Sequence, residues 1–99
     1  MSDSPTLAEF QAHLHETFTI QADGDRSIEL VLDQIKVQER QPKGYECFSV
    51  TFECPEDIYL EQAIYALQHP VLGAREIFLV PSAPEKGGAS FEAVFNRKL

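Results

Sequence analysis

A chain of 99 residues and 11.2 kDa has room for one domain with a single hydrophobic core. Its 43% apolar and 24% charged residues are typical of a globular protein and exclude a disordered or fibrous one. A net charge of −8 disfavours nucleic acid and anionic lipid as partners, because both are themselves negatively charged. No signal-peptide pattern or apolar run of the roughly 20 residues that span a membrane is visible. We therefore expect a cytoplasmic single domain over residues 1–99.

The two cysteines, Cys47 and Cys54, stand seven positions apart in one strand-like run. A strand places residues at that spacing on opposite faces and roughly 23 Å apart, which is too far for a disulfide. Two unpaired thiols favour a reducing compartment. We expect Cys54 in the core and Cys47 partly exposed.

The first predicted element is a short helix over about residues 6–14. Thr6 and Glu9 have the spacing of a capping box, in which each side chain bonds the other's backbone N–H. Leu7, Phe10 and Leu14 then recur at intervals of three and four and give the helix one apolar face. The helix is expected to end near Leu14 or His15.

Residues 17–22 and 27–38 alternate between apolar and polar and predict two strands, joined by a turn at Asp23-Gly24-Asp25. This turn places Ile20 opposite Ile28. The apolar positions of the second strand change phase after Leu32, which predicts a bulge near Asp33-Gln34.

A third strand, residues 45–54, has the cleanest alternation in the chain, with Phe48, Val50, Phe52 and Cys54 facing inward. Strands at about 62–69 and 74–81 follow, with Pro70–Gly73 expected as a four-residue turn that pairs Ile64 with Leu79 and Tyr65 with Phe78. Both faces of that hairpin would be apolar, so that the N-terminal helix or a partner must cover one of them. With a last strand at about 89–96, the pattern predicts a mainly β fold, a six-stranded antiparallel small barrel or sandwich with one short N-terminal helix.

Reactive side chains form no recognisable catalytic or metal-binding motif. His13 and His15 are two positions apart, which splays them on a helix, and His69 precedes Pro70 and is interpreted as an extended residue that enters a turn. We expect no catalytic residue, no metal and no cofactor, and therefore no enzyme. The carboxylates near the end of the third strand are interpreted as a solvated acidic rim: Glu53, Glu56, Asp57 and Glu61.

Five blocks of the chain, read in order, resemble a bacterial family of single-domain proteins that is known as a domain of unknown function. They are Thr6–Phe10, Leu14–Phe18, His69–Gly73, Ile77–Pro81 and Phe91–Asn96. Members of that family are often encoded beside phage tail-collar proteins of the microcystin-dependent type, so the resemblance implies an accessory role in assembling a tail-like fibre. Many members have glycine after the helix, where this chain has His15.

The function expected from these observations is protein binding without catalysis. The predicted module is an assembly factor or structural accessory for a tail-collar-like or fibre protein, or it associates with itself. It would bury an apolar strand face or add a strand to a sheet edge, with the acidic rim steering the approach. The alternative is a small barrel that binds an apolar ligand. The candidate interface consists of Ile64, Ala66, Ile77, Leu79 and Val94.

Overall fold

The computed structural model describes residues 5–21, 27–84 and 87–98, so the expected turn at Asp23-Gly24-Asp25 lies outside the described residues. One helix and six strands make up the structure, and each begins and ends within two residues of the range expected from the sequence. They are α1 (Leu7–Ala12), β1 (Thr17–Gln21), β2 (Ser27–Val37), β3 (Tyr45–Cys54), β4 (Ala63–His69), β5 (Gly73–Ser82) and β6 (Ala89–Lys98).

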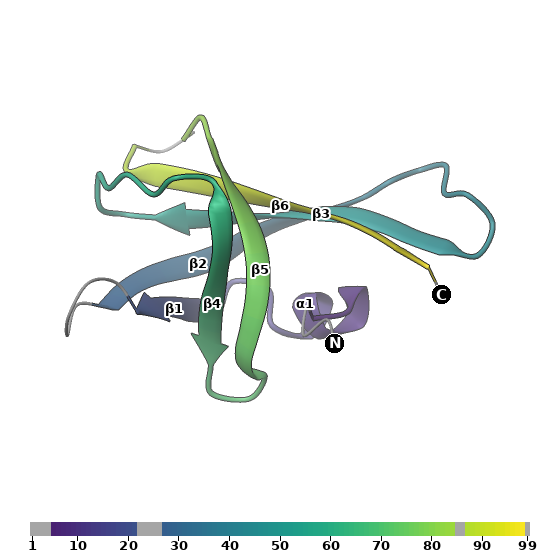
Figure 1. Ribbon diagram of the computed structural model, residues 1–99, viewed down its shortest axis with the longest axis horizontal. Helices are drawn as coiled ribbons and strands as arrows, with labels where there is room; N and C mark the ends of the chain where they lie inside the picture. Colours follow the sequence, from purple (N-terminus) through teal and green to yellow (C-terminus); the bar gives the residue numbers. More distant parts are fainter. Residues whose placement is uncertain (1–4, 22–26, 85–86, 99) are drawn as a thin grey trace.

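The six strands are antiparallel and close into a barrel in the order β1-β2-β3-β6-β5-β4 (Figure 1). The mainly β fold with a short N-terminal helix is thereby confirmed. The first hairpin has the expected register, with Ile20 opposite Ile28. The barrel closes where β1 meets β4 through two register pairs, Thr19 with Gln68 and Ile20 with Leu67.

The predicted bulge in β2 is present. Leu32 pairs with Phe52 of β3, and the next pair is Gln34 with Thr51, so that Asp33 is an extra residue in the ladder. This insertion returns Ile35 to the inner face, opposite the buried Val50. One strand can therefore supply apolar side chains to the core on both sides of its bend.

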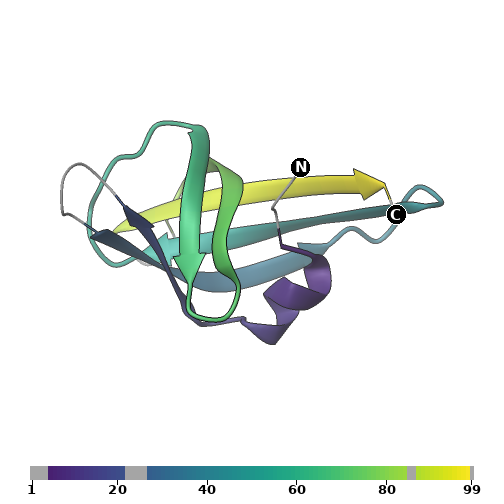
Figure 2. The same ribbon diagram turned by 60° about the horizontal axis from the view of Figure 1, so that its bottom comes forward.

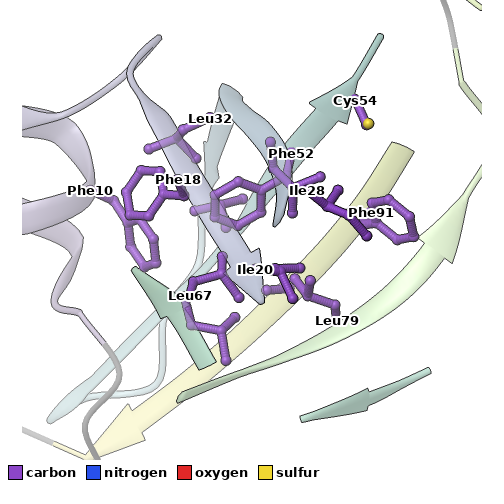
Figure 3. Close-up of a cluster of buried hydrophobic side chains, with 14 of the residues drawn as sticks. Phe10, Phe18, Ile20, Ile28, Leu32, Phe52, Cys54, Leu67, Leu79 and Phe91 are labelled. Carbon is purple, nitrogen blue, oxygen red and sulfur yellow. The ribbon is translucent and has the colours of Figure 1, made fainter. Parts of the chain in front are cut away.

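Helix α1 covers one end of the barrel interior with Phe10, which is completely buried (Figure 3). The predicted capping box between Thr6 and Glu9 is present. Phe10 meets Phe48 and Phe52 edge to face at centroid distances of 5.9 and 6.5 Å. The helix thus packs on β3, and it does not lie across the β4–β5 hairpin as one of our expectations had it.

The end of α1 differs from the prediction. The helix ends at Ala12, and His15 takes a left-handed φ of 73°. The expected apolar stripe therefore stops at Phe10, and Leu14 is 37% exposed. A left-handed residue favours glycine, which is the residue that the resemblance implies at this place.

The register of the β4–β5 hairpin differs by one residue from the prediction. Gly73 pairs with His69, so the turn contains three residues rather than four, and Ile64 pairs with Phe78. Ile77 and Leu79 consequently point into the core. The other face is not covered as we expected, because Ile64 is 65% exposed and Phe78, which was expected inside, is 48% exposed.

Cys47 is a further correction. It faces outward on β3 as predicted, yet it is only 4% exposed. The loop after β2 contacts this residue, because the Cys47 N–H donates to Oε1 of Gln41 at 3.1 Å. Strand alternation alone does not reveal such a contact.

Three strands continue beyond the closed barrel. β6 pairs with β5 only from Ser90 to Glu92, but it pairs with β3 as far as Lys98. We call this extension the arm; it comprises residues 34–50 and 93–98. Figures 1 and 2 show β3 and β6 running side by side past β5, with α1 beneath them. α1 is the single helix in the described ranges, and its six residues are too few to cross a bilayer.

Candidate functional site: the free edge of β6 and a histidine cluster

The five residues of the expected interface do not share one surface. Ile77 and Leu79 are 1% and 0% exposed and belong to the barrel core, so no partner can reach them in the folded chain. Ile64, Ala66 and Val94 are exposed on the outer face. The predicted interface did not include Phe78, which faces outward beside Ile64 because of the one-residue register shift.

Val94 lies on the part of β6 that extends beyond its pairing with β5. Among the described residues, the backbone of β6 from Ala93 to Lys98 pairs with β3 alone. One long edge of this strand is therefore unpaired over six residues, or about 20 Å. A strand edge of this kind presents N–H and C=O groups that another chain can bond.

The orientation of these groups follows from Pro81. Pro81 pairs with Phe91 but has no N–H, so this pair exchanges no hydrogen bonds and its neighbours do. The β5–β6 bonds therefore involve the even-numbered residues of β6, such as Glu92. Since this alternation continues along an unbulged strand, the backbone groups of Val94 and Asn96 point to the free edge.

A shallow groove of about 440 Å³ adjoins this edge on the outer face of the arm. Lys36, Ser49 and Val94 form one row across its three strands, because Lys36 pairs with Ser49 and Ser49 with Val94. Asn96 lines it further along β6. With Val94 63% exposed, the groove offers an apolar contact next to free backbone groups.

A second candidate is a cluster of His13, Glu16 and His69, which lies between α1 and the β4–β5 turn. Oε1 of Glu16 is 2.9 Å from Nδ1 of His13 and 2.7 Å from Nε2 of His69. The imidazole ring of His69 also packs on Phe18, with centroids 4.8 Å apart. The potential metal-ligand atoms of the three residues lie within 4.8 Å of one another. Residues in this arrangement could in principle bind a metal ion or act as an acid–base pair.

The hydrogen bonds of His69 oppose both functions. Its Nδ1 accepts from the backbone N–H groups of Val71 and Leu72 at 3.0 and 3.3 Å, so the ring proton is on Nε2 and is donated to Glu16. A metal at Nε2 would require a proton on Nδ1, where two N–H groups already point. The His69 side chain is also 3% exposed and has no free nitrogen for a substrate. The cluster is a structural clamp on the turn.

The clamp also acts on the carboxylate. Hydrogen bonds from His13 and, next in size, His69 hold the pKa of Glu16 below its ordinary value of 4.5. Sequence reasoning compared His13 only with His15 and did not place His69 beside it. The available signal was the position of His69 at a strand end before a proline turn, where a side-chain acceptor can bond the turn's N–H groups.

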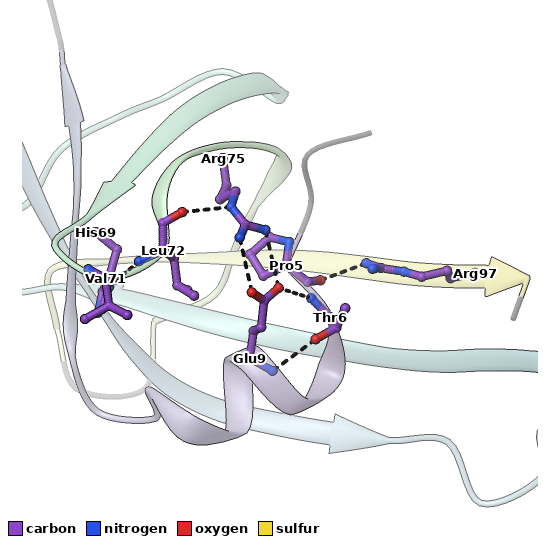
Figure 4. A network of polar contacts seen from close by, with 8 residues as sticks. All are labelled: Pro5, Thr6, Glu9, His69, Val71, Leu72, Arg75 and Arg97. Carbon is purple, nitrogen blue, oxygen red and sulfur yellow. Dashed lines mark hydrogen bonds and ion pairs between the residues drawn. The ribbon is translucent and has the colours of Figure 1, made fainter. Parts of the chain in front are cut away.

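A second clamp joins α1 to the same turn (Figure 4). Arg75 of β5 donates from both terminal nitrogens to the Glu9 carboxylate at 3.3 and 3.1 Å, and from Nε to the carbonyl of Leu72 at 2.9 Å. The N–H of Thr6 donates to the same carboxylate at 3.0 Å. The bond from the Thr6 backbone, followed by the charge and bonds of Arg75, lowers the pKa of Glu9.

These features define a class of protein: a small closed antiparallel barrel with a helix across one end and a three-stranded arm whose outer edge is free. A family model described as a domain of unknown function, DUF6916, matches residues 5–95. The chain belongs to this family. No curated protein and no solved structure matches it.

Proposed function

We propose that the protein is a non-enzymatic protein-binding module that accepts a strand of another protein along the free edge of β6. The observation that carries this proposal is the outer edge of β6 from Ala93 to Lys98, along which no other described strand pairs. Strand addition obtains its affinity from main-chain hydrogen bonds and its specificity from pockets for alternate side chains. The groove beside Val94 would provide such a pocket.

The edge has few of the devices that normally prevent strand addition. Residues 93–98 contain no proline, and the ladder with β3 continues through them without a bulge. Proteins usually protect such edges with prolines, bulges, a covering segment or inward-pointing charges. Two such devices are present, the edge lysine Lys98 and the inward-facing Arg97, but both stand at the end of the strand and leave Val94 and Asn96 accessible.

The partner that we propose is a tail-collar-like or fibre protein, with this chain as its assembly factor or structural accessory. This part rests on the resemblance of the five sequence blocks and on what it implies about neighbouring genes. An accessory of this kind could accept an extended segment of its partner along an exposed sheet edge. We place the interaction in the cytoplasm, since Cys47 and Cys54 are both free thiols.

The barrel interior favours this function over the binding of an apolar ligand. The positions that face inward are occupied by large side chains that pack into one cluster, and Phe10 covers its end (Figure 3). A ligand would have to displace these side chains, whereas a strand can bind at the β6 edge without moving the core.

The proposal is tested by removing one outward N–H from the edge. Asn96→Pro deletes that donor and leaves the bonds to β3, because the Asn96 backbone points away from β3. Asn96→Ala is the matched control, since it removes the same side chain and keeps the N–H. Tagged wild type and both variants would be purified from the native host, and the retained proteins quantified by mass spectrometry.

We expect one partner to be retained by the wild type and by Asn96→Ala, and its recovery to fall at least about tenfold with Asn96→Pro. In the isolated complex, the amides of Val94 and Asn96 should gain protection from hydrogen exchange. Circular dichroism melts would check that both variants are folded. Equal recovery with folded Asn96→Pro would refute strand addition at this edge.

A further inference from the structure

We propose that the strand accepted by the arm is acidic: an extended segment in which apolar side chains alternate with Asp or Glu. This inference rests on the proposed function, because it specifies the chemistry of the partner at the same edge. Three observations on the arm support it: its charge, the position of its lysines and the groove beside Val94.

The charge of the chain is strongly divided. The arm contains five of the eight Lys and Arg residues but only two of the sixteen Asp and Glu residues, so it carries +3 while the rest of the chain carries −11. An acidic protein thus has a cationic extension at the place where its sheet edge is free. Charges of opposite sign on a partner would steer it toward the arm and away from the barrel. We therefore assign the steering to the basic arm, whereas the sequence analysis assigned it to the acidic rim.

Two lysines place this charge on the outer face of the arm. Lys36 lies in the row of Ser49 and Val94, and Lys98 lies four residues beyond Val94 on the same face of β6. Both are exposed, and neither forms an ion pair with any residue in the described ranges. The unpaired ammonium group of Lys98, on the strand that accepts a neighbour, favours a carboxylate on that neighbour.

Arg97 contributes differently, because its side chain is on the inner face. It lies over the Phe95 ring, with the guanidinium carbon 5.6 Å from the ring centroid, and it donates to the carbonyl of Pro5 at 2.8 Å. Its orientation is thus fixed by the segment that leads into α1 (Figure 4). Lys98 is the cation next to an added strand on the outer face. Lys36 lies three strand spacings, or about 14 Å, from that strand and adds only to the long-range field, which salt screens.

The apolar half of the pattern follows from Val94. Side chains of an added strand alternate between the two faces of the arm, and those beside Val94 would enter the groove. A second copy of this chain is a poor occupant through its own β6, because two arms side by side would bring two surfaces of +3 net charge together. Nucleic acid would be repelled by the net charge of −11 on the rest of the chain. It also has no extended peptide backbone to pair with the free N–H and C=O groups of β6.

The experiment uses three labelled peptides with acetyl and amide ends: VEVEVEVE, VQVQVQVQ and VKVKVKVK. Binding to the full chain would be measured by fluorescence anisotropy at 50 and 300 mM NaCl. The tested variant is Lys36→Gln/Lys98→Gln. Its matched control is Gln62→Glu/Gln68→Glu, which changes the net charge by the same two units on exposed residues of the barrel.

We expect VEVEVEVE to bind, VQVQVQVQ to bind at least about tenfold more weakly, and VKVKVKVK not to bind. The lysine variant should weaken VEVEVEVE binding at least about tenfold, the control less than about twofold, and the higher salt should weaken the wild-type complex. Asn96→Pro should also lose the acidic peptide, because the backbone contacts are needed as well.

The outcomes separate this inference from the proposed function. Equal binding of VEVEVEVE and VQVQVQVQ, both lost with Asn96→Pro, would overturn the acidic preference and leave strand addition intact. Binding that depends on the lysines but not on Asn96→Pro would overturn strand addition at this edge. Failure of every peptide, tighter binding of a single-stranded oligothymidine, or self-association in place of peptide binding would overturn the acidic-strand inference, and the host purification would then decide the proposed function.

Discussion

The β4–β5 turn and the arm both lie at the ends of antiparallel strands, but the polar groups of the turn have partners within the chain and those of the arm point to solvent. At the turn, His69 accepts hydrogen bonds from two backbone N–H groups, and Glu16 is hydrogen-bonded to two histidines. Arg75 forms an ion pair with Glu9. On the arm, Lys36 and Lys98 lack ion-pair partners among the described residues, and β6 has lost its neighbour on one side.

The difference shows where the chain has completed its own interactions and where it has not. Each polar group that fixes the turn to α1 is satisfied within the chain, as stability requires of partly buried groups. The arm exposes backbone N–H and C=O groups and ammonium groups that could bind a partner.

The largest effect is expected from a charge in the barrel compared with the same charge on the arm. Leu79→Glu should cost at least about 3–5 kcal/mol and threaten folding, because it buries an unpaired carboxylate where the side chain is 0% exposed. Val94→Glu should change the free energy of unfolding by no more than about 0.5 kcal/mol. Urea titration measures both. Phe78→Glu is the register control, and unfolding by that substitution would contradict the observed pairing.

The clamp at the turn is tested by His69→Phe, which keeps a ring against Phe18 but removes the acceptor for Val71 and Leu72. We expect a loss of about 1–3 kcal/mol, since two partly buried N–H groups lose their acceptor and each such bond contributes about 0.5–1.5 kcal/mol. Hydrogen exchange at these two amides should accelerate, and exchange at Val94 should not. Unchanged exchange at Val71 and Leu72 would mean that the imidazole does not hold the turn.

A smaller effect of opposite sign is expected at the end of α1. His15→Gly should stabilise the chain by up to about 1 kcal/mol, because φ is 73° there and glycine adopts that region without steric cost. His15→Ala is the control and should give no gain. Thermal or urea unfolding of the three proteins would reveal the ranking, and a destabilised glycine variant would contradict it.

The smallest effect concerns pH. The pKa of Glu16 is lowered in the folded chain by hydrogen bonds from His13 and His69, relative to an ordinary value of 4.5. The stability that Glu16 contributes is therefore complete above about pH 4.5 and is lost as pH falls through its lower folded pKa. Urea titrations from pH 3 to 7 should show a shallower acid loss for Glu16→Gln than for the wild type. Parallel curves would exclude this linkage.

Sequence patterns predicted those parts of the fold that depend on local alternation. The six strands, the capping box of Thr6 and Glu9, and the bulge at Asp33 all follow from side chains close together in the chain. The prediction of the β4–β5 register was wrong, because proline and glycine permit both a three-residue and a four-residue turn. The two turns differ by one residue, which reverses the side chains that face the core.

The candidate site was less predictable because it is made by contacts between distant segments. Val94 was correctly identified as outward-facing, but nothing local to β6 shows that β5 leaves it after Glu92. His13 and His69 come together on Glu16, and Gln41 bonds the backbone of Cys47, only in the folded chain. Such contacts depend on topology rather than on periodicity.

The closure of the barrel is uneven, and this unevenness has a mechanical consequence. β1 and β4 share two register pairs, whereas β3 and β6 share ten. If the cylinder is pulled open, the β1–β4 seam should part first, and the β4–β5 hairpin would swing away on its attachment to β6. The long β3–β6 ladder would stay intact through that opening, so the surface that we assign to binding stands on the most durable part of the molecule.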